Sequence, residues 1–171
     1  WGRYKNARSD DDRLIYGYKF PEGLQSNQVF PEYMGKNGVI FTPTTKEETG
    51  HDRPITHQQA WDDITKLYGS DYADALIHAG YELFRRGQER LAERGLLLVD
   101  TKYEFGFDKD KNIMLIDEIH TPDSSRMWEA ETYEERFAAG QNPDSFDKEI
   151  LRRNLAEKGF KGEGEVPRLD D

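Results

Sequence analysis

The sequence predicts an α+β fold, in which helices pack on an antiparallel sheet. Short aromatic stretches separated by turn formers occupy the first fifty positions, two helical patterns follow, and alternating strand patterns then precede a final helix. A chain of 171 residues is long enough for one sizeable domain. The expected strands thus lie before and after the two central helices, and a third helix follows the last strand.

The first third is expected to hold two strands. "RLIYGYKFPEGL" reads as one strand ending at Pro21, and "GVIFTPTTK" as another ending at Pro43, because proline cannot donate a ladder hydrogen bond. The segment between them, "QSNQVFPEYMGKNG", contains turn formers and is predicted to be a loop.

Two helices are predicted next. Thr56 and Gln59 have the spacing of a capping box, which indicates a helix that continues to Tyr68. A second helix is expected from residue 70 to residue 94, with Gly95 as its left-handed stop. Its apolar stripe includes two glycines, which lower helix propensity and therefore indicate a close approach to a sheet: Gly80 and Gly87.

The segment "LLLVDTKYEFGFDKDKNIMLIDEIHTPDSSRMW" predicts two strands joined by a tight turn. Asp100, Lys102 and Glu104 alternate along the first strand, so they share one face. If "KDKN" is a four-residue loop, Glu104 lies opposite Asp117 on that same face.

Two interpretations of this charged face remain open on these residues alone. Opposed carboxylates repel each other, and a hard divalent ion such as Mg²⁺ would offset the repulsion, with Lys102 beside a polyphosphate held by that metal. Alternatively, Lys102 pairs with Glu104 and Asp100 in a surface ladder whose ion pairs each contribute less than ~1 kcal/mol. The first interpretation is a nucleotide–metal site and the second is ordinary surface chemistry.

Two further segments carry candidate ligand groups. "TPDSSRMW" places Arg126 directly after the second strand, and its planar guanidinium suits a carboxylate or a phosphate. "FTPTTKEETGHD" offers hydroxyls and Lys46 to an anion, although an ordinary turn is favoured when this loop is taken by itself. Residues 120–144 read as a polar connector, and a last helix is expected from about Ser145.

Composition excludes several classes of protein. The net charge of −10 opposes binding to duplex nucleic acid, and no apolar run is long enough to suggest a membrane span. The absence of cysteine excludes disulfides, thiolate metal sites and cysteine nucleophiles. No secretory signal is recognised, so a cytoplasmic location is expected.

Four separated blocks of the sequence resemble the phosphoribosylaminoimidazole-succinocarboxamide synthase (SAICAR synthetase) family. They are "PEGLQSNQVFPE", "IFTPTTKEETGHD", "VDTKYEFGFD" and "LIDEIHTPDSSRMW", and the resemblance extends almost end to end through "DSFDKEILRRNL". The resemblance implies an ATP-dependent ligase of de novo purine biosynthesis with the fold of that family. Such an enzyme joins the carboxylate of carboxyaminoimidazole ribonucleotide to the amine of L-aspartate through an acyl phosphate, giving SAICAR, ADP and phosphate.

The resemblance also implies roles for individual residues, with ATP and Mg²⁺ as cofactors. The implied catalytic residues are Lys46, Lys102, Asp123 and Arg126. ATP would contact Lys102, Glu104 and Asp117, and Mg²⁺ would be held by Glu104, Asp117 and Glu118. The implied substrate-binding residues are Lys46, His51, Asp52, Ser124, Ser125, Arg126 and Lys148.

The chain departs from the family pattern at its ends. Residues 1–171 match the central and C-terminal ATP- and substrate-binding part, whereas the glycine-rich N-terminal lobe that covers ATP in the family is not found in them. We therefore expect the chain by itself to be inactive. The expected partners are the small-molecule substrates and the family's N-terminal lobe, with no nucleic acid or membrane, and a homo-oligomer stays open. The alternative function is a non-catalytic nucleotide-binding or interaction module that keeps the fold.

Overall fold

The computed structural model describes residues 2–47, 49–50, 52–160, 164 and 167–168. The chain divides into two compact units, residues 1–81 and 82–171. Helices and antiparallel strand pairs occur together, which confirms the α+β class. None of the helices in the described ranges is long and apolar enough to cross a membrane.

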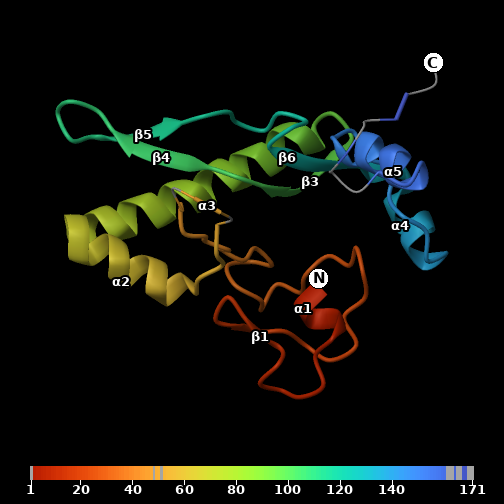
Figure 1. Ribbon diagram of the computed structural model, residues 1–171, viewed down its shortest axis with the longest axis horizontal. Coiled ribbons are helices and arrows are strands. Elements are labelled where there is room, and N and C mark those ends of the chain that lie inside the picture. The colour runs from red at the N-terminus through yellow and green to blue at the C-terminus, as the bar shows by residue number, and fades with distance from the viewer. Residues whose placement is uncertain (1, 48, 51, 161–163, 165–166, 169–171) are drawn as a thin grey trace. The chain divides into compact units, whose positions relative to one another are not determined.

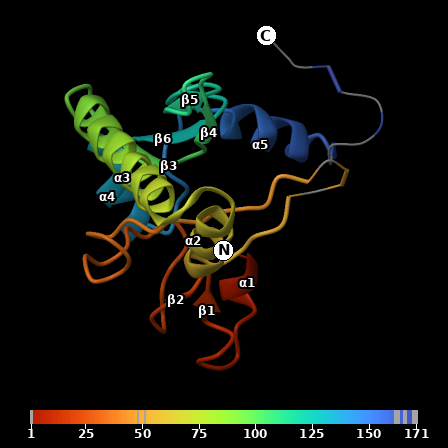
Figure 2. The ribbon, with the colours of Figure 1, turned by 90° about the vertical axis from the view of Figure 1, so that its left-hand side faces the viewer.

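The first unit is built around a small aromatic and aliphatic core. The short helix α1 (Gly2–Lys5) places the Tyr4 hydroxyl 2.8 Å from the Pro21 carbonyl oxygen, to which it donates, and the same hydroxyl accepts from the Leu24 amide at 2.7 Å. Figure 2 shows α1 beside the first strand pair. The buried core comprises Ile15, Phe20, Leu24 and Met34.

The strands of the first unit are shorter than the sequence predicted. "RLIYGYKF" forms two two-residue strands, β1 (Leu14–Ile15) and β2 (Tyr18–Lys19), because Tyr16 and Gly17 both take positive φ, 56° and 87°, and turn the chain back. The prediction of one continuous strand there was wrong. So was the strand at "GVIFTPTTK", whose residues make only isolated bridges.

Helix α2 (His57–Tyr68) begins with the predicted capping box. The Thr56 hydroxyl accepts from the Gln59 amide at 3.1 Å, and the Gln59 side chain accepts from the Thr56 amide at 2.9 Å. Helix α3 (Ser70–Ala92) follows after Gly69, and α2 folds back along its first turns (Figure 1). Gly95 takes φ +72°, as its predicted role as a left-handed stop requires.

The second unit contains two strand pairs rather than the single hairpin predicted. β3 (Leu96–Thr101) pairs with β6 (Ser125–Glu129), and β4 (Glu104–Phe107) pairs with β5 (Ile113–Ile116). Figure 1 shows the β4–β5 hairpin extending beyond the β3–β6 pair. The chain leaves the first ladder at Lys102 and Tyr103, where the pairing partner changes.

The register of the β4–β5 hairpin differs by one residue from the predicted one. Glu104 lies opposite Ile116, not opposite Asp117, because the loop has five residues instead of four. Asp108 closes this longer loop: its amide donates to the Asn112 carbonyl oxygen at 3.0 Å, and its carboxylate accepts from the Asn112 amide at 2.8 Å. Asp117 therefore follows the strand and takes φ +71°.

The segment predicted as a polar connector contains ordered elements. Strand β6 is followed directly by helix α4 (Ala130–Ala138), so the connector prediction for residues 120–144 was wrong in that part. The last helix, α5 (Glu149–Glu157), begins four residues after the predicted Ser145. Ser145 instead forms a bridge with Trp128, which extends the chain alongside β6 before the helix starts.

Candidate functional site

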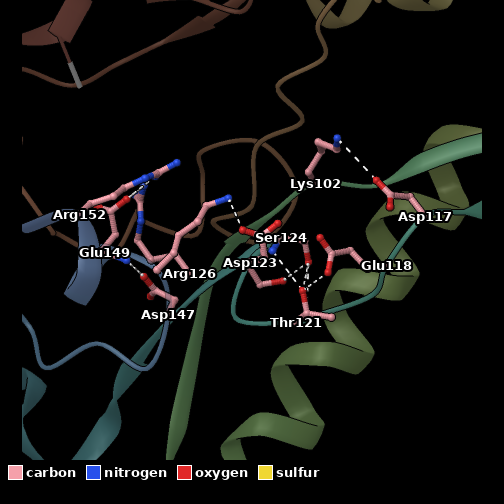
Figure 3. A network of polar contacts seen from close by, with 12 residues as sticks. Lys102, Asp117, Glu118, Thr121, Asp123, Ser124, Arg126, Asp147, Glu149 and Arg152 are labelled. Carbon is pink, nitrogen blue, oxygen red and sulfur yellow. Dashed lines mark hydrogen bonds and ion pairs between the residues drawn. The ribbon is translucent and has the colours of Figure 1, made fainter. Parts of the chain in front are cut away.

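A polar cavity of about 240 Å³ lies in the second unit, where the ends of several elements meet. Side chains from the β3–β4 break, the β5–β6 connection and the start of α5 line it, and Figure 3 shows how they point toward one another. Its charged lining residues are Asp100, Lys102, Glu118, Asp123, Arg126, Asp147, Lys148, Glu149 and Arg152. Both signs of charge thus border one small space.

Lys102 joins the two carboxylates that were predicted to bind a cation. Its Nζ atom lies 2.6 Å from Glu104 Oε1 and 3.7 Å from Asp117 Oδ2. Hydrogen bonding to Glu104 and the charge of Asp117 both raise the pKa of Lys102. Although the predicted register was wrong, the two carboxylates still converge, since both reach the same ammonium group.

This pair fits a metal ion that arrives with a nucleotide. Magnesium is usually held by one or two protein carboxylates together with substrate phosphates and water. Within the described part of the chain, no three His, Asp or Glu side chains gather closely enough to hold a metal by themselves. Binding of Mg²⁺ by Glu104 and Asp117 would therefore require a nucleotide as well, and this metal role stays a prediction.

Glu118 makes a different contact from this pair. Its carboxylate accepts from the Thr121 hydroxyl, as Figure 3 shows, while Lys102 lies with Asp117. The structure therefore brings Glu104 and Asp117 together at one ammonium and places Glu118 on a different polar network. Its role as a metal ligand stays a prediction.

A chain of hydroxyls continues from Glu118 into the floor of the cavity. The Thr121 hydroxyl lies 3.3 Å from Ser124 Oγ, which lies 3.2 Å from Ser125 Oγ. Ser125 is buried, and its hydroxyl pairs with Thr101 Oγ1 of β3 at 2.8 Å. The hydroxyls of the two predicted serines thus link the β5–β6 connection to Thr101 of β3.

Asp123 and Lys148 form an ion pair in the lining of the cavity. Lys148 Nζ lies 3.1 Å from Asp123 Oδ1. This bond, with a smaller contribution from the neighbouring Glu118 carboxyl, lowers the pKa of Asp123. Lys148, which the resemblance assigned to substrate binding, thus lies beside Asp123 in the cavity lining, and its role stays a prediction.

Arg126 and Arg152 supply the remaining cations. Arg126 lies 3.1 Å from Asp100 Oδ2 across the β3–β6 pair, and Arg152 lies 2.6 Å from Glu149 Oε1 within α5. These pairs are half-exposed, and exposed ion pairs contribute only ~0–1 kcal/mol each. An incoming phosphate or carboxylate can therefore replace the carboxylate partner of either arginine at little cost in free energy.

Several lining residues were missed by sequence reasoning. Arg152 follows Lys148 by four positions, a spacing that puts both on one helical face, so a signal for it was present. Asp147 is 5% exposed, and its carboxylate accepts from the Met127 amide at 2.9 Å and the Glu149 amide at 2.8 Å. No pattern in the sequence separates this buried carboxylate from its exposed neighbours.

The remaining predicted residues belong to the first unit. The loop that carries Lys46 and Asp52 is closed by the Thr44–Pro54 bridge, and Asp52 accepts from the Glu47 amide at 3.0 Å. His51 lies outside the described residues. The substrate-binding roles of these three residues stay predictions.

A larger cavity, of about 490 Å³, lies within the first unit, but its lining is mostly aromatic. The Tyr18 and Tyr81 hydroxyls lie 3.3 Å apart across it, and the His57 ring centroid is 5.2 Å from that of Tyr18. These groups contact one another, and the cavity lacks the charged lining of the one in the second unit.

Comparison with known proteins gives a consistent result. The SAICAR synthetase family model matches residues 6–169. Phosphoribosylaminoimidazole-succinocarboxamide synthase of Bacteroides fragilis is 45% identical over 99% of this chain and 51% of the relative, and that of Cyberlindnera jadinii is 39% identical over 100% and 51%. The chain therefore spans about half the length of these curated relatives.

Solved structures lead to the same family. The SAICAR synthase of Saccharomyces cerevisiae complexed with SAICAR has a TM-score of 0.68 and 32% identity, covering 99% of this chain and 50% of the other. The SAICAR synthetase of Pyrococcus horikoshii has a TM-score of 0.52 and 29% identity, covering 70% and 47%. The fold and the matched sequence define a member of a biosynthetic enzyme family. The chain belongs to the SAICAR synthetase family.

Proposed function

We propose that this chain forms the ATP- and substrate-binding part of a ligase of purine biosynthesis. The reaction joins the carboxylate of carboxyaminoimidazole ribonucleotide to the amine of L-aspartate and consumes ATP. The observation that carries the proposal is the arrangement of charge in the second unit. Lys102, Arg126, Lys148 and Arg152 line one cavity. Lys102 also pairs with two carboxylates beyond the cavity lining, those of Glu104 and Asp117.

This arrangement suits activation of a carboxylate followed by acyl transfer. The γ-phosphoryl group moves to a carboxylate oxygen, breaking its bond to ADP, and the amine nitrogen then attacks the carbonyl carbon while phosphate leaves. Mg²⁺, held by Glu104 and Asp117 when nucleotide is bound, would neutralise phosphate charge. Lys102 would orient the migrating group, and Arg126, Lys148 and Arg152 would hold the anionic ends of the other substrates.

The test uses a chimera in which these 171 residues replace the matching half of the Bacteroides fragilis relative. We expect the chimera to form SAICAR from ATP, Mg²⁺, aspartate and the ribonucleotide. Changing Asp117→Asn removes one negative charge without changing size and should lower kcat by ~100-fold or more, since phosphate charge is then poorly neutralised. Raising the Mg²⁺ concentration should restore part of the lost rate.

Asp110→Asn is the matched control, because Asp110 lies in the exposed β4–β5 loop. It should leave the rate unchanged. Equal activity of the Asp117→Asn variant and the parent chimera would remove the metal assignment. An inactive chimera that still binds nucleotide would favour the alternative, a non-catalytic nucleotide-binding module.

A further inference from the structure

Tyr103 and His120 contact each other, and each lies in a segment that also carries residues of the proposed site. Tyr103 lies between Lys102 and Glu104 in the chain, and His120 lies between Glu118 and Asp123. The Tyr103 hydroxyl is 2.5 Å from His120 Nε2, and the two rings meet edge to face with centroids 5.6 Å apart. One contact thus joins the strand that provides Lys102 to the connection that provides Asp123.

Helix α3 leaves space for this pair at Gly87. A Cβ atom built on Gly87 would lie 2.3 Å from His120 Cε1 and 2.8 Å from Leu98 Cδ2, so any larger residue would displace the imidazole. The imidazole is therefore confined by the helix on one side and by the tyrosine hydroxyl on another.

The backbone around His120 also requires a restraint. Asp117 and His120 take φ values of +71° and +48°, in the left-handed region that residues other than glycine rarely adopt. Such conformations persist when the surrounding structure holds them.

We propose that the Tyr103–His120 pair is a positioning device, which fixes residues 117–124 relative to Lys102 and Glu104. The inference rests on the proposed function, since it assigns the pair to the geometry of that site. Neither residue lines the cavity, so both act through their neighbours. The pair keeps Asp117 beside Lys102 and keeps the Asp123 segment beside β3.

Two backbone hydrogen bonds report on this geometry. The Lys102 amide donates to the Ser124 carbonyl oxygen at 3.2 Å, and the Ser125 amide donates to the Thr121 carbonyl oxygen at 2.9 Å. If the pair fixes the connection, loss of the Tyr103 hydroxyl will expose both amides to exchange with solvent more often.

The experiment compares Tyr103→Phe with Tyr81→Phe in the chimera. Each change removes one hydroxyl from a half-buried ring, but Tyr81 pairs with Tyr18 outside the site. We expect Tyr103→Phe to lower kcat roughly 10- to 100-fold with a smaller change in KM for aspartate, because misplaced catalytic groups slow the reaction more than they weaken binding. Hydrogen exchange of the Lys102 and Ser125 amides should accelerate, whereas Tyr81→Phe should change neither quantity.

A double-mutant cycle separates the pair from general effects on packing. His120→Leu alone leaves the Tyr103 hydroxyl without this partner, whereas the double variant with Tyr103→Phe removes both polar groups together. We therefore expect the double variant to be no slower than His120→Leu.

Additive losses in the cycle, or equal effects of Tyr103→Phe and Tyr81→Phe, would overturn the inference. A lower melting temperature with unchanged kcat would also overturn it, because it would indicate a purely structural contact. An inactive parent chimera would instead count against the proposed function. In that case, faster exchange in Tyr103→Phe would still support the positioning role, and unchanged exchange would contradict it.

Discussion

Glu47 organises the loop that carries Lys46 and Asp52. Its carboxylate accepts from the Thr45 hydroxyl at 2.8 Å and from Arg53 Nε at 3.0 Å. Bonding to the Thr45 hydroxyl, and then to Arg53, lowers the pKa of Glu47 below its ordinary value of 4.5. Because the folded value is below the unfolded one, this stabilisation is complete above about pH 4.5 and is lost as the pH falls through the folded value.

We predict that the loop loosens in acid and that Glu47→Gln removes this dependence on pH. The Thr45 amide, which donates to the Arg53 carbonyl oxygen at 2.9 Å, provides the signal, and its NMR shift can be followed from neutral solution to about pH 3. Glu32→Gln, at an exposed position of the same unit, is the control and should titrate like the parent chain. A parent-like titration of Glu47→Gln would show that another group controls the loop.

The starts of two helices show which local features the sequence predicts well and which it does not. Thr56 and Gln59 act locally, so the start of α2 could be predicted from their spacing alone. Asp147 acts through the Met127 amide, twenty positions away, and this long-range bond helps to hold the chain beside β6 before α5 begins. A contact of that kind leaves no local pattern, so the predicted helix started too early.

Helix α3 carries two glycines whose surroundings differ. A Cβ atom on Gly80 would meet nothing within 4 Å, whereas one on Gly87 would overlap the His120 ring. The sequence predicted close approach at both positions, and the structure places such an approach only at Gly87. The same substitution at the two sites therefore separates helix propensity from packing.

We predict that Gly80→Ala stabilises the chain by roughly 0.5–1 kcal/mol, because alanine is the better helix former. Gly87→Ala gains the same propensity but crowds His120, at a typical overpacking cost of ~1–3 kcal/mol, so a net loss of stability is expected. Urea unfolding of the two variants and the parent measures both free energies. A stabilising Gly87→Ala would mean that the His120 ring moves freely, which would also weaken its proposed positioning role.

The strands of the second unit show why register is harder to predict than strand position. A strand was expected on each side of the turn, the first from its alternation and the second from its apolar run, and β4 and β5 both occur. Their register depended on whether the loop held four or five residues, a choice made by the Asp108–Asn112 hydrogen bonds. The pairing of β3 with β6 joins residues separated by more than twenty positions, and periodicity carries no information about such partners.

At the scale of the whole molecule, several residues that the sequence assigned to the site lie around one cavity, while their roles stay predictions. Lys102, Asp123, Arg126 and Lys148 were identified from sequence blocks and line one cavity of the second unit. They come from three separate sequence blocks, so only the resemblance to a family, not spacing, indicated that all four belong together. Lys46 and Asp52 belong to the other unit, and their part in the site stays a prediction.

The size of the cavity bears on what the chain can do by itself. Ligand pockets usually enclose ~300–1,000 Å³, whereas this one measures about 240 Å³. The proposed function would require it to serve ATP and two further substrates. An acyl phosphate formed in so small and exposed a space would be open to water, and excluding water is part of how closed sites protect reactive intermediates. We infer from the size of this cavity that it does not by itself support amide formation coupled to ATP use.

We therefore predict no detectable SAICAR when the chain alone is mixed with ATP, Mg²⁺, aspartate and the ribonucleotide, under conditions in which the chimera is active. Chromatographic separation of SAICAR from the ribonucleotide measures amide formation, and a phosphate assay in the same samples measures ATP hydrolysis. Phosphate release without amide would agree with an acyl phosphate that is lost to water. Amide formation by the chain alone at a rate comparable to that of the chimera would contradict the prediction, because it would mean that the groups lining this cavity are sufficient for both chemical steps.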